Sequence, residues 1–251
     1  MGSLSARGLG PLPEVLAGED LATFIAETPA GAALRNDQVL AIAQKVVSKA
    51  EGAVVALADV VPGERARRLG EDQDKDPRAV QVVLDESVEI LRAERGVLIC
   101  RTRHGFVCAN AGVDASNAAD PDTLIVLPRD PDASARRIRA RLRELMGTAP
   151  AVLITDSFGR SWRNGQLDVA IGIAGMQPLD DWRGRNDAHG LKLRATWLAV
   201  GDAAAACADL ARAKDSREPV VVVDGLERYV TDDDGPGAAE LLRPIEEDLF
   251  R

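Results

Sequence analysis

Two aspartates stand directly after short apolar runs, where their carboxylates could hold a metal ion. Asp114 follows "FVCANAGV" and Asp156 follows "AVLIT". Asn117 and Ser157 lie close behind them and add amide and hydroxyl oxygens, the donors that Mg²⁺ and Mn²⁺ prefer. Either aspartate could instead be a turn residue that bonds its own backbone. Two similar clusters in one chain favour a divalent metal site.

Basic side chains near these clusters could contact phosphate. Lys49 lies in "KVVSKAEG", one helical turn after Lys45, and Arg160 and Arg163 follow Asp156 in "GRSWRNGQ". A lysine can bind a triphosphate, and guanidinium groups can stabilise a transferring phosphoryl group. The alternatives are a solvated lysine and arginines paired with surface acids. The sequence contains no P-loop motif.

Cys100, His104 and Cys108 are equally spaced and raise the alternative of a zinc-stabilised structural module. Zinc in such modules usually has four thiolate or imidazole ligands. A turn at His104 would place the two cysteines on opposite arms of a hairpin, and no fourth ligand is nearby in the sequence. Buried cysteines that only pack in a core explain the same pattern.

Composition limits the classes of function. The 251 residues are enough for one large domain or two closely packed lobes, with 46% hydrophobic and 28% charged residues. A net charge of -9 argues against a nucleic-acid partner. The absence of a membrane-length apolar run and of a signal peptide predicts no membrane partner and a cytoplasmic location. The three cysteines are expected to be reduced thiols.

The pattern of apolar residues predicts a mixed α/β (α+β) fold without internal repeats. Helices are expected at 45–52, 76–96 and 130–147, strands at 38–44, 123–128, 151–156 and 219–225, a hairpin from 97–100 and 106–109, and a strand followed by a helix within 197–214. Loops are expected at 1–10 and 68–78, and a turn at 157–160. We treat 1–10 as a flexible N-terminal segment and 11–251 as one module.

These segments together resemble the coenzyme F420-0:L-glutamate ligase family, also called coenzyme F420 gamma-glutamyl ligases. The similarity runs through "LPEV", "KVVSKAEG", "RHGFVCANAGVDASN" and "ITDSFGRSWRNGQLDVAIGIAGM" in the family's order. It implies the gamma-glutamyl ligase-type fold and an intertwined homodimer. Some members carry a C-terminal flavin-binding domain, and this chain resembles the stand-alone form.

The resemblance also assigns roles to individual positions. Asp114 and Asp156 match aspartates that share one metal ion, and Ser157 falls where a threonine commonly binds another. The positions that match nucleotide contacts are Leu12, Pro13, Glu14, Val15, Gln44, Lys49 and Asn117. Gln44 stands where some members have a serine. Arg160 and Arg163 are the candidates for stabilising the transferred phosphoryl group.

The reaction implied is GTP-driven amide synthesis. The terminal carboxylate of coenzyme F420-0 accepts the γ-phosphoryl group of GTP, and the amine of L-glutamate displaces phosphate; later rounds add γ-linked glutamates. The implied ions are Mn²⁺ or Mg²⁺, with K⁺ as an additional candidate. Two other functions stay open on the residues alone: a ligase of the same fold that acts on another carboxylate cofactor, and a non-catalytic nucleotide-binding protein.

Overall fold

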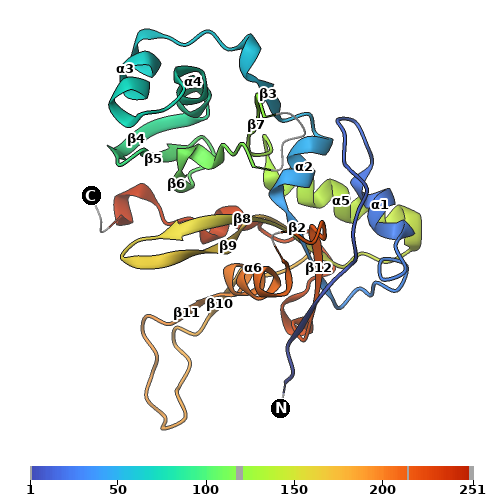
Figure 1. Cartoon of the computed structure of the whole chain (residues 1–251). Coiled ribbons are helices and arrows are strands. Elements are labelled where there is room, and N and C mark those ends of the chain that lie inside the picture. The colour runs from blue at the N-terminus through green and yellow to red at the C-terminus, as the bar shows by residue number, and fades with distance from the viewer. Residues whose placement is uncertain (1, 117–120, 214, 249–251) are drawn as a thin grey trace.

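A five-stranded sheet forms the centre of the computed structural model, which describes residues 2–116, 121–213 and 215–248 (Figure 1). Its strands, in spatial order, are β1 (Ser5–Gly8), β12 (Val220–Asp224), β2 (Val39–Ala43), β8 (Ala151–Arg160) and β9 (Arg163–Ala174). The pair β2–β8 is parallel and the other three pairs are antiparallel. The mixed α/β class expected from the sequence is confirmed.

Helices cover both faces of this sheet. On one face lie α1 (Leu21–Glu27), α2 (Gln44–Ala50) and α5 (Pro131–Met146), and on the other lies α6 (Val200–Ala211). The β2 residues alternate between the two faces: Leu40 packs in the first core and Val39 in the second. This period of two explains why the central strands are apolar throughout. No helix of the described residues is long and apolar enough to cross a membrane.

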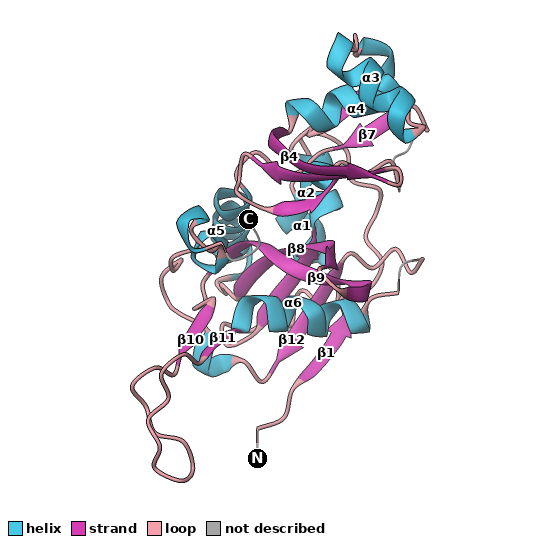
Figure 2. Cartoon of the chain, turned by 90° about the vertical axis from the view of Figure 1, so that its left-hand side faces the viewer, coloured by secondary structure: helices cyan, strands magenta, loops and turns pink. Residues whose placement is uncertain are grey.

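A second lobe is inserted between β2 and β8, and Figure 2 shows it beyond one end of the main sheet. It contains β3 (Val54–Ala56), α3 (Glu64–Gln73), α4 (Pro77–Asp85), β4 (Ser87–Glu94), β5 (Val97–Thr102), β6 (Val107–Ala109) and β7 (Thr123–Ile125). Strands β4, β5 and β6 form one sheet, and β3 pairs with β7. The lobe has its own small apolar clusters, so it can hold a fixed shape beside the main sheet.

The remaining elements are short. Strands β10 (Leu179–Asp181) and β11 (Trp197–Ala199) pair at the base of a long loop that extends from the main body (Figure 1). The 3-10 helices are Leu57–Asp59, Asn110–Gly112, Glu227–Tyr229, Ala238–Leu241 and Ile245–Glu247.

A buried arginine of α5 holds the chain that follows the last strand. The Arg139 side chain is 3% exposed, and it donates to the backbone oxygens of Pro150 and of residues 231–233 and to the carboxylate of Asp234. These acceptors satisfy the fixed fork of guanidinium donors inside the protein. The residue therefore fastens the segment after β12 to the helix that covers the sheet.

Several predicted elements are confirmed. Helix α5 begins after Asp130, whose carboxylate accepts from the Ala133 backbone N–H, and ends at Gly147 in the left-handed region. The hairpin of β5 and β6 is present, and the strands at 38–44, 151–156 and 219–225 correspond to β2, β8 and β12. The strand expected at 123–128 is shorter, because β7 ends at Ile125.

The helix predicted for 76–96 is wrong in its second half. Helix α4 ends at Asp85, and Ser87–Glu94 form strand β4 against β5. Arg95 and Gly96 both have positive φ, so Gly96 belongs to a tight hairpin turn and does not end a helix. The apolar residues that suggested a helical period are also compatible with a strand once β5 lies beside them.

Three expected loops also differ from the structure. Residues 68–78 are largely helical, because α3 continues to Gln73 and α4 begins at Pro77. Ser5–Gly8, within the segment expected to be flexible, form β1 at the edge of the main sheet. The turn expected at 157–160 is a continuation of β8, which reaches Arg160. In each case pairing or packing with a distant segment decided a conformation that the local sequence left open.

Candidate active site

A cavity of about 610 Å³ lies at the carboxyl ends of the parallel strands β2 and β8. Ligand sites in α/β proteins commonly lie at such strand ends. Four distant parts of the chain line this cavity: residues 12–15, the end of β2 with α2, the β8–β9 pair, and residues 212–219. The fold therefore brings together most of the segments that carried the sequence motifs.

Lys45, at the start of α2, lies between the two halves of the predicted metal site. Its Nζ is 2.7 Å from Asp114 Oδ2 and donates to Ser116 Oγ at 2.5 Å. The Ser116 backbone N–H also donates to Asp114. Burial raises the pKa of Asp114, but these bonds from Lys45 and Ser116 outweigh it and bring the pKa below its ordinary value. Asp114 is thus ionised and held toward α2.

Asp156, on β8, lies in the opposite electrostatic situation. Burial, together with the charges of Asp168 and Asp114, raises the pKa of Asp156 to about 7, although the Ser157 backbone N–H and the charge of Lys45 act to lower it. Negative charge is therefore under-compensated at this point of the cavity. A bound cation would remove that imbalance.

The donor set fits a hard divalent cation. Asp114, Asp156 and the Ser157 hydroxyl supply oxygens only, as Mg²⁺ and Mn²⁺ prefer. Within the described residues, no three side chains of His, Cys, Asp or Glu are grouped to hold a metal. An ion here would therefore complete its coordination with hydroxyl, water or phosphate oxygens. The predicted contact Asn117 lies outside the described residues.

The expected nucleotide contacts within the described residues line the same cavity, with one complication. Leu12 and Val15 are buried in the main core, whereas Pro13 and Glu14 between them are exposed. Lys49 Nζ is 2.6 Å from the carboxylate of Glu14. This ion pair places both side chains at the cavity wall.

Gln44 is the complication. Its amide is buried, and Nε2 donates to Ser48 Oγ at 2.5 Å and to the Val126 carbonyl at 3.0 Å. These two bonds use both amide protons. Gln44 could therefore contact a nucleotide only through its amide oxygen or its backbone.

Arg160 and Arg163 do not line the cavity. They face each other at the tip of the β8–β9 hairpin, where both are exposed and Arg160 donates to the Asn164 carbonyl. Because β8 continues past Asp156, Arg160 is about 13 Å further along the strand at ~3.3 Å per residue. The expectation that these arginines stand beside the second carboxylate is not met within one chain.

Several cavity residues were not proposed for the site from the sequence, among them Lys45, Asp168 and Arg212. Lys45 is one helical turn before Lys49, and this spacing could have marked both. Asp168 is a single acid in the apolar strand "LDVAIGIA", where a carboxylate needs a partner. Arg212 ends an Ala-rich helix and carries no local signal of its burial.

The structure places the cysteines as the hairpin interpretation expected. Cys100 and Cys108 are buried cross-strand neighbours on β5 and β6. His104 Nε2 is 2.9 Å from the Pro128 carbonyl oxygen. Burial, then the charges of Asp156 and Cys100, raise the pKa of Cys108 to about 12. A zinc ligand would have to be a thiolate, which this environment disfavours.

We therefore expect the purified protein to contain no stoichiometric zinc. Elemental analysis by plasma mass spectrometry checks this directly. One zinc per chain, lost together with secondary structure on chelation, would support the structural zinc module instead.

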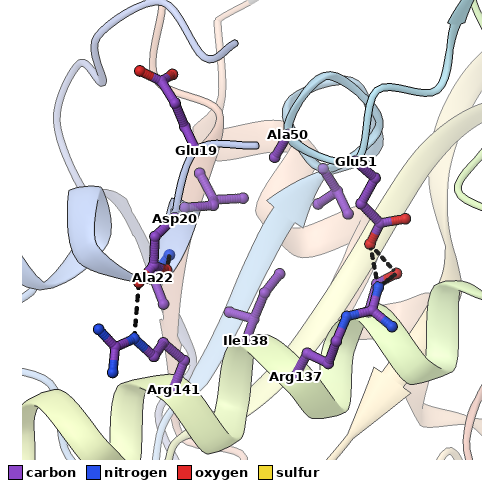
Figure 3. A pocket seen from close by; sticks show the side chains of 11 residues that line it. Glu19, Asp20, Ala22, Ala50, Glu51, Arg137, Ile138 and Arg141 are labelled. Carbon is purple, nitrogen blue, oxygen red and sulfur yellow. Dashed lines mark hydrogen bonds and ion pairs between the residues drawn. The ribbon is translucent and has the colours of Figure 1, made fainter. Parts of the chain in front are cut away.

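A smaller hollow of about 260 Å³ lies on the other side of α2, between α1 and α5 (Figure 3). Four of its charged side chains form two ion pairs: Arg137 Nη2 is 2.5 Å from Glu51, and Arg141 Nε is 2.8 Å from Asp20. Lys45 and Lys49 of the larger cavity are paired as well, so ion pairing alone does not distinguish the two hollows. The larger cavity, which contains the under-compensated carboxylate, is the better candidate.

Comparison with known proteins identifies the family of the chain. The model of the F420-0:gamma-glutamyl ligase family matches residues 10–225, which include every described cavity segment. The chain belongs to this family. Among its relatives in the family, the coenzyme F420:L-glutamate ligase of Methanopyrus kandleri is 44% identical, with 100% of both chains covered. The enzymes of the same name from Methanothermobacter thermautotrophicus and Methanocaldococcus jannaschii are 41% and 38% identical, over 99% and 96% of this chain and 99% and 94% of theirs.

Proposed function

We propose that this protein is a GTP-dependent ligase that joins L-glutamate to the terminal carboxylate of coenzyme F420-0. The step belongs to coenzyme F420 biosynthesis, and later rounds add γ-linked glutamates. The observation that carries the proposal is the family match at 44% identity to a coenzyme F420:L-glutamate ligase over the whole chain. The cavity supports it by bringing lysines and oxygen donors into one place.

The reaction needs an activated carboxylate. A carboxylate is a poor electrophile, so the γ-phosphoryl group of GTP is first transferred to one of its oxygens, which releases GDP. The amine of L-glutamate then attacks the acyl carbon, loses a proton and displaces inorganic phosphate. No side-chain nucleophile takes part, so the residues must position the reactants and balance charge.

The cavity residues can supply these roles. Lys45 and Lys49 project from one helix into the cavity, where their ammonium groups can bind phosphate oxygens. Asp114 and Asp156 would hold one divalent ion, Mn²⁺ or Mg²⁺, and the Ser157 hydroxyl would contact another. When bound, these ions supply positive charge for the transferring phosphoryl group. Residues 12–15 would border the nucleotide.

A homodimer is part of the proposal. Arg160 and Arg163 are exposed at a hairpin tip and do not line the cavity of their own chain. Trp162, between them, is 82% exposed. If these arginines contact a phosphoryl group, that group is held by a second copy of the chain. Sedimentation velocity tests this arrangement, and a monomer at working concentration would contradict it.

Mass spectrometry of a complete reaction tests the function. Coenzyme F420-0, GTP, L-glutamate and Mn²⁺ or Mg²⁺ are incubated with the protein, and we expect product masses increased by one or more glutamyl units. We also expect GTP to be preferred over ATP in phosphate release. Phosphate release that requires another carboxylate cofactor would favour the related ligase. Nucleotide binding without any phosphate release would favour a non-catalytic protein.

Replacing Lys49 by alanine is expected to raise the KM for GTP about tenfold or more, with a smaller effect on the KM for glutamate. A charge-assisted bond to phosphate contributes about 1.5–3 kcal/mol, and it is lost with the ammonium group. Steady-state kinetics with each substrate varied in turn measures the two constants. Lys192→Ala, in the exposed β10–β11 loop, is the matched control. Unchanged GTP kinetics would return Lys49 to a solvated role.

A further inference from the structure

Four polar side chains form a cluster in the wall of the cavity: Thr155, Ser157, Asp168 and Arg212. Asp168 lies at its centre and is 2% exposed. Its Oδ2 accepts from Thr155 Oγ1 at 2.8 Å and from Arg212 Nη1 at 2.9 Å, and its Oδ1 accepts from Ser157 Oγ at 2.6 Å. The cluster joins β8, β9 and the end of α6.

Burying the ion pair between Asp168 and Arg212 costs desolvation free energy. The Arg212 side chain is only 8% exposed, and its Nε is buried without a hydrogen-bond partner in the described part of the chain. Replacing such an ion pair by apolar residues is often neutral or stabilising in other proteins. Stability alone therefore does not account for the ion pair. The hydrogen bond from Ser157 to Asp168 indicates a second role, in orienting Ser157.

The hydrogen bond between Ser157 and Asp168 fixes the orientation of the Ser157 hydroxyl group. A serine hydroxyl has one proton and two lone pairs, whereas a carboxylate can only accept. Ser157 Oγ donates its hydrogen bond to Asp168, which is ion-paired with Arg212. The serine oxygen can therefore interact with a further group only as a hydrogen-bond acceptor or a metal ligand. A hydroxyl held in this way is prepared for a cation and not for another acceptor.

We propose that Asp168 is a positioning residue that holds Ser157 with its oxygen presented to a divalent cation in the cavity, while the ion pair with Arg212 holds the Asp168 carboxylate in place. The inference rests on the proposed function only in that the cation is the one that accompanies the nucleotide. Partners that orient a metal ligand in this way typically change metal affinity 10–100-fold when removed.

The test measures Mn²⁺ binding without nucleotide or turnover, by following free Mn²⁺ with electron paramagnetic resonance during titration. We expect Ser157→Ala and Asp168→Asn each to weaken binding about tenfold or more. The double variant should bind Mn²⁺ no more weakly than the single variant with the lower affinity, because both substitutions remove the same interaction. Ser157→Thr, which keeps the hydroxyl, should bind Mn²⁺ as the wild type does.

Asp202→Asn is the matched control, because Asp202 is another partly buried carboxylate that bonds the same strand, at the Ala170 backbone N–H, but does not line the cavity. It should leave Mn²⁺ affinity unchanged. Circular dichroism shows whether each variant is folded. If Asp168→Asn is not, Asp168→Asn combined with Arg212→Gln removes both charges and takes its place in the test.

Wild-type affinity in a folded Asp168→Asn protein, or additive losses in the double variant, would overturn the proposal, as would a wild type that binds no Mn²⁺. Failure of the proposed function looks different. In that case Mn²⁺ binding follows the expected pattern, but no glutamyl unit is added to coenzyme F420-0.

Discussion

Replacing Asp156 by asparagine is expected to abolish turnover while leaving the metal-free protein at least as stable as the wild type. The change keeps the shape of the side chain but removes one charge that would hold the divalent ion, so phosphoryl transfer should fall by several orders of magnitude. In the metal-free protein the same carboxylate lies among other acids, and burial is the main reason that its pKa is raised to about 7. Asparagine relieves that unfavourable charge.

The stability difference should depend on pH in a defined direction. The pKa of Asp156 is about 7 in the folded chain and 3.8 when unperturbed, so folding favours the protonated form. Its contribution is most favourable below pH 4 and is lost as pH rises to about 7. The asparagine variant does not titrate here, so its advantage over the wild type should grow across this window, by a few kcal/mol at most.

Thermal melts at pH 5 and pH 8, with and without Mn²⁺, measure this beside one turnover assay. Added Mn²⁺ should raise the Tm of the wild type more than that of the variant. Asp202→Asn is the control: the partly buried Asp202 carboxylate also has a pKa raised by burial but lies outside the cavity, so this variant should stay active. If Asp156 only bonds its own turn, the variant keeps its activity and Mn²⁺ stabilises both proteins alike.

The largest loss of stability is expected from Arg139→Met. The substitution keeps much of the side-chain volume but removes the donors that satisfy the carbonyls of residues 231–233 and the charge that faces Asp234. Breaking a buried network of this kind costs about 3–5 kcal/mol. For a chain of this size that lowers the Tm by roughly 6–20 °C.

Differential scanning calorimetry measures the change, and Arg143→Ala, exposed on the same helix, is the control. We expect the control to shift the Tm by no more than about 2 °C, since exposed substitutions change stability by at most ~0.5 kcal/mol. A similar small shift for Arg139→Met would show that residues 231–234 contribute little to the folded state.

The sequence predicted cavity residues that have a clear local signal. Asp156 at the end of an apolar run and Lys49 on a short helix have local signals, and both line the cavity. Arg160 lies outside the cavity of its own chain because β8 continues through "SFGR" and pairs with β9, and nothing local in the sequence indicates this pairing. Asp168 and Arg212 were missed because their pairing joins positions far apart in the chain.

The same reason explains the errors in the fold. Helix α5 has a cap at Asp130 and a stop at Gly147, and both signals are local. The segment 87–94 was predicted to be helical but forms a strand, because β5 provides a pairing partner. Ser5–Gly8 look like loop material until β12, from the other end of the chain, pairs with them. Patterns therefore predict elements well where the deciding interactions are close in sequence.

The position of β12 has a consequence for synthesis of the protein. Val220–Asp224 form the strand that joins β1 to β2, although both of those strands leave the ribosome far earlier. Until β12 emerges, β2 lacks its neighbour on that side, so its backbone N–H and C=O groups are unpaired and its apolar side chains are exposed. The sheet can close only when nearly the whole chain has been translated. The incomplete sheet therefore persists through most of the synthesis of the chain, and its exposed apolar strands are the kind of surface on which nascent chains aggregate.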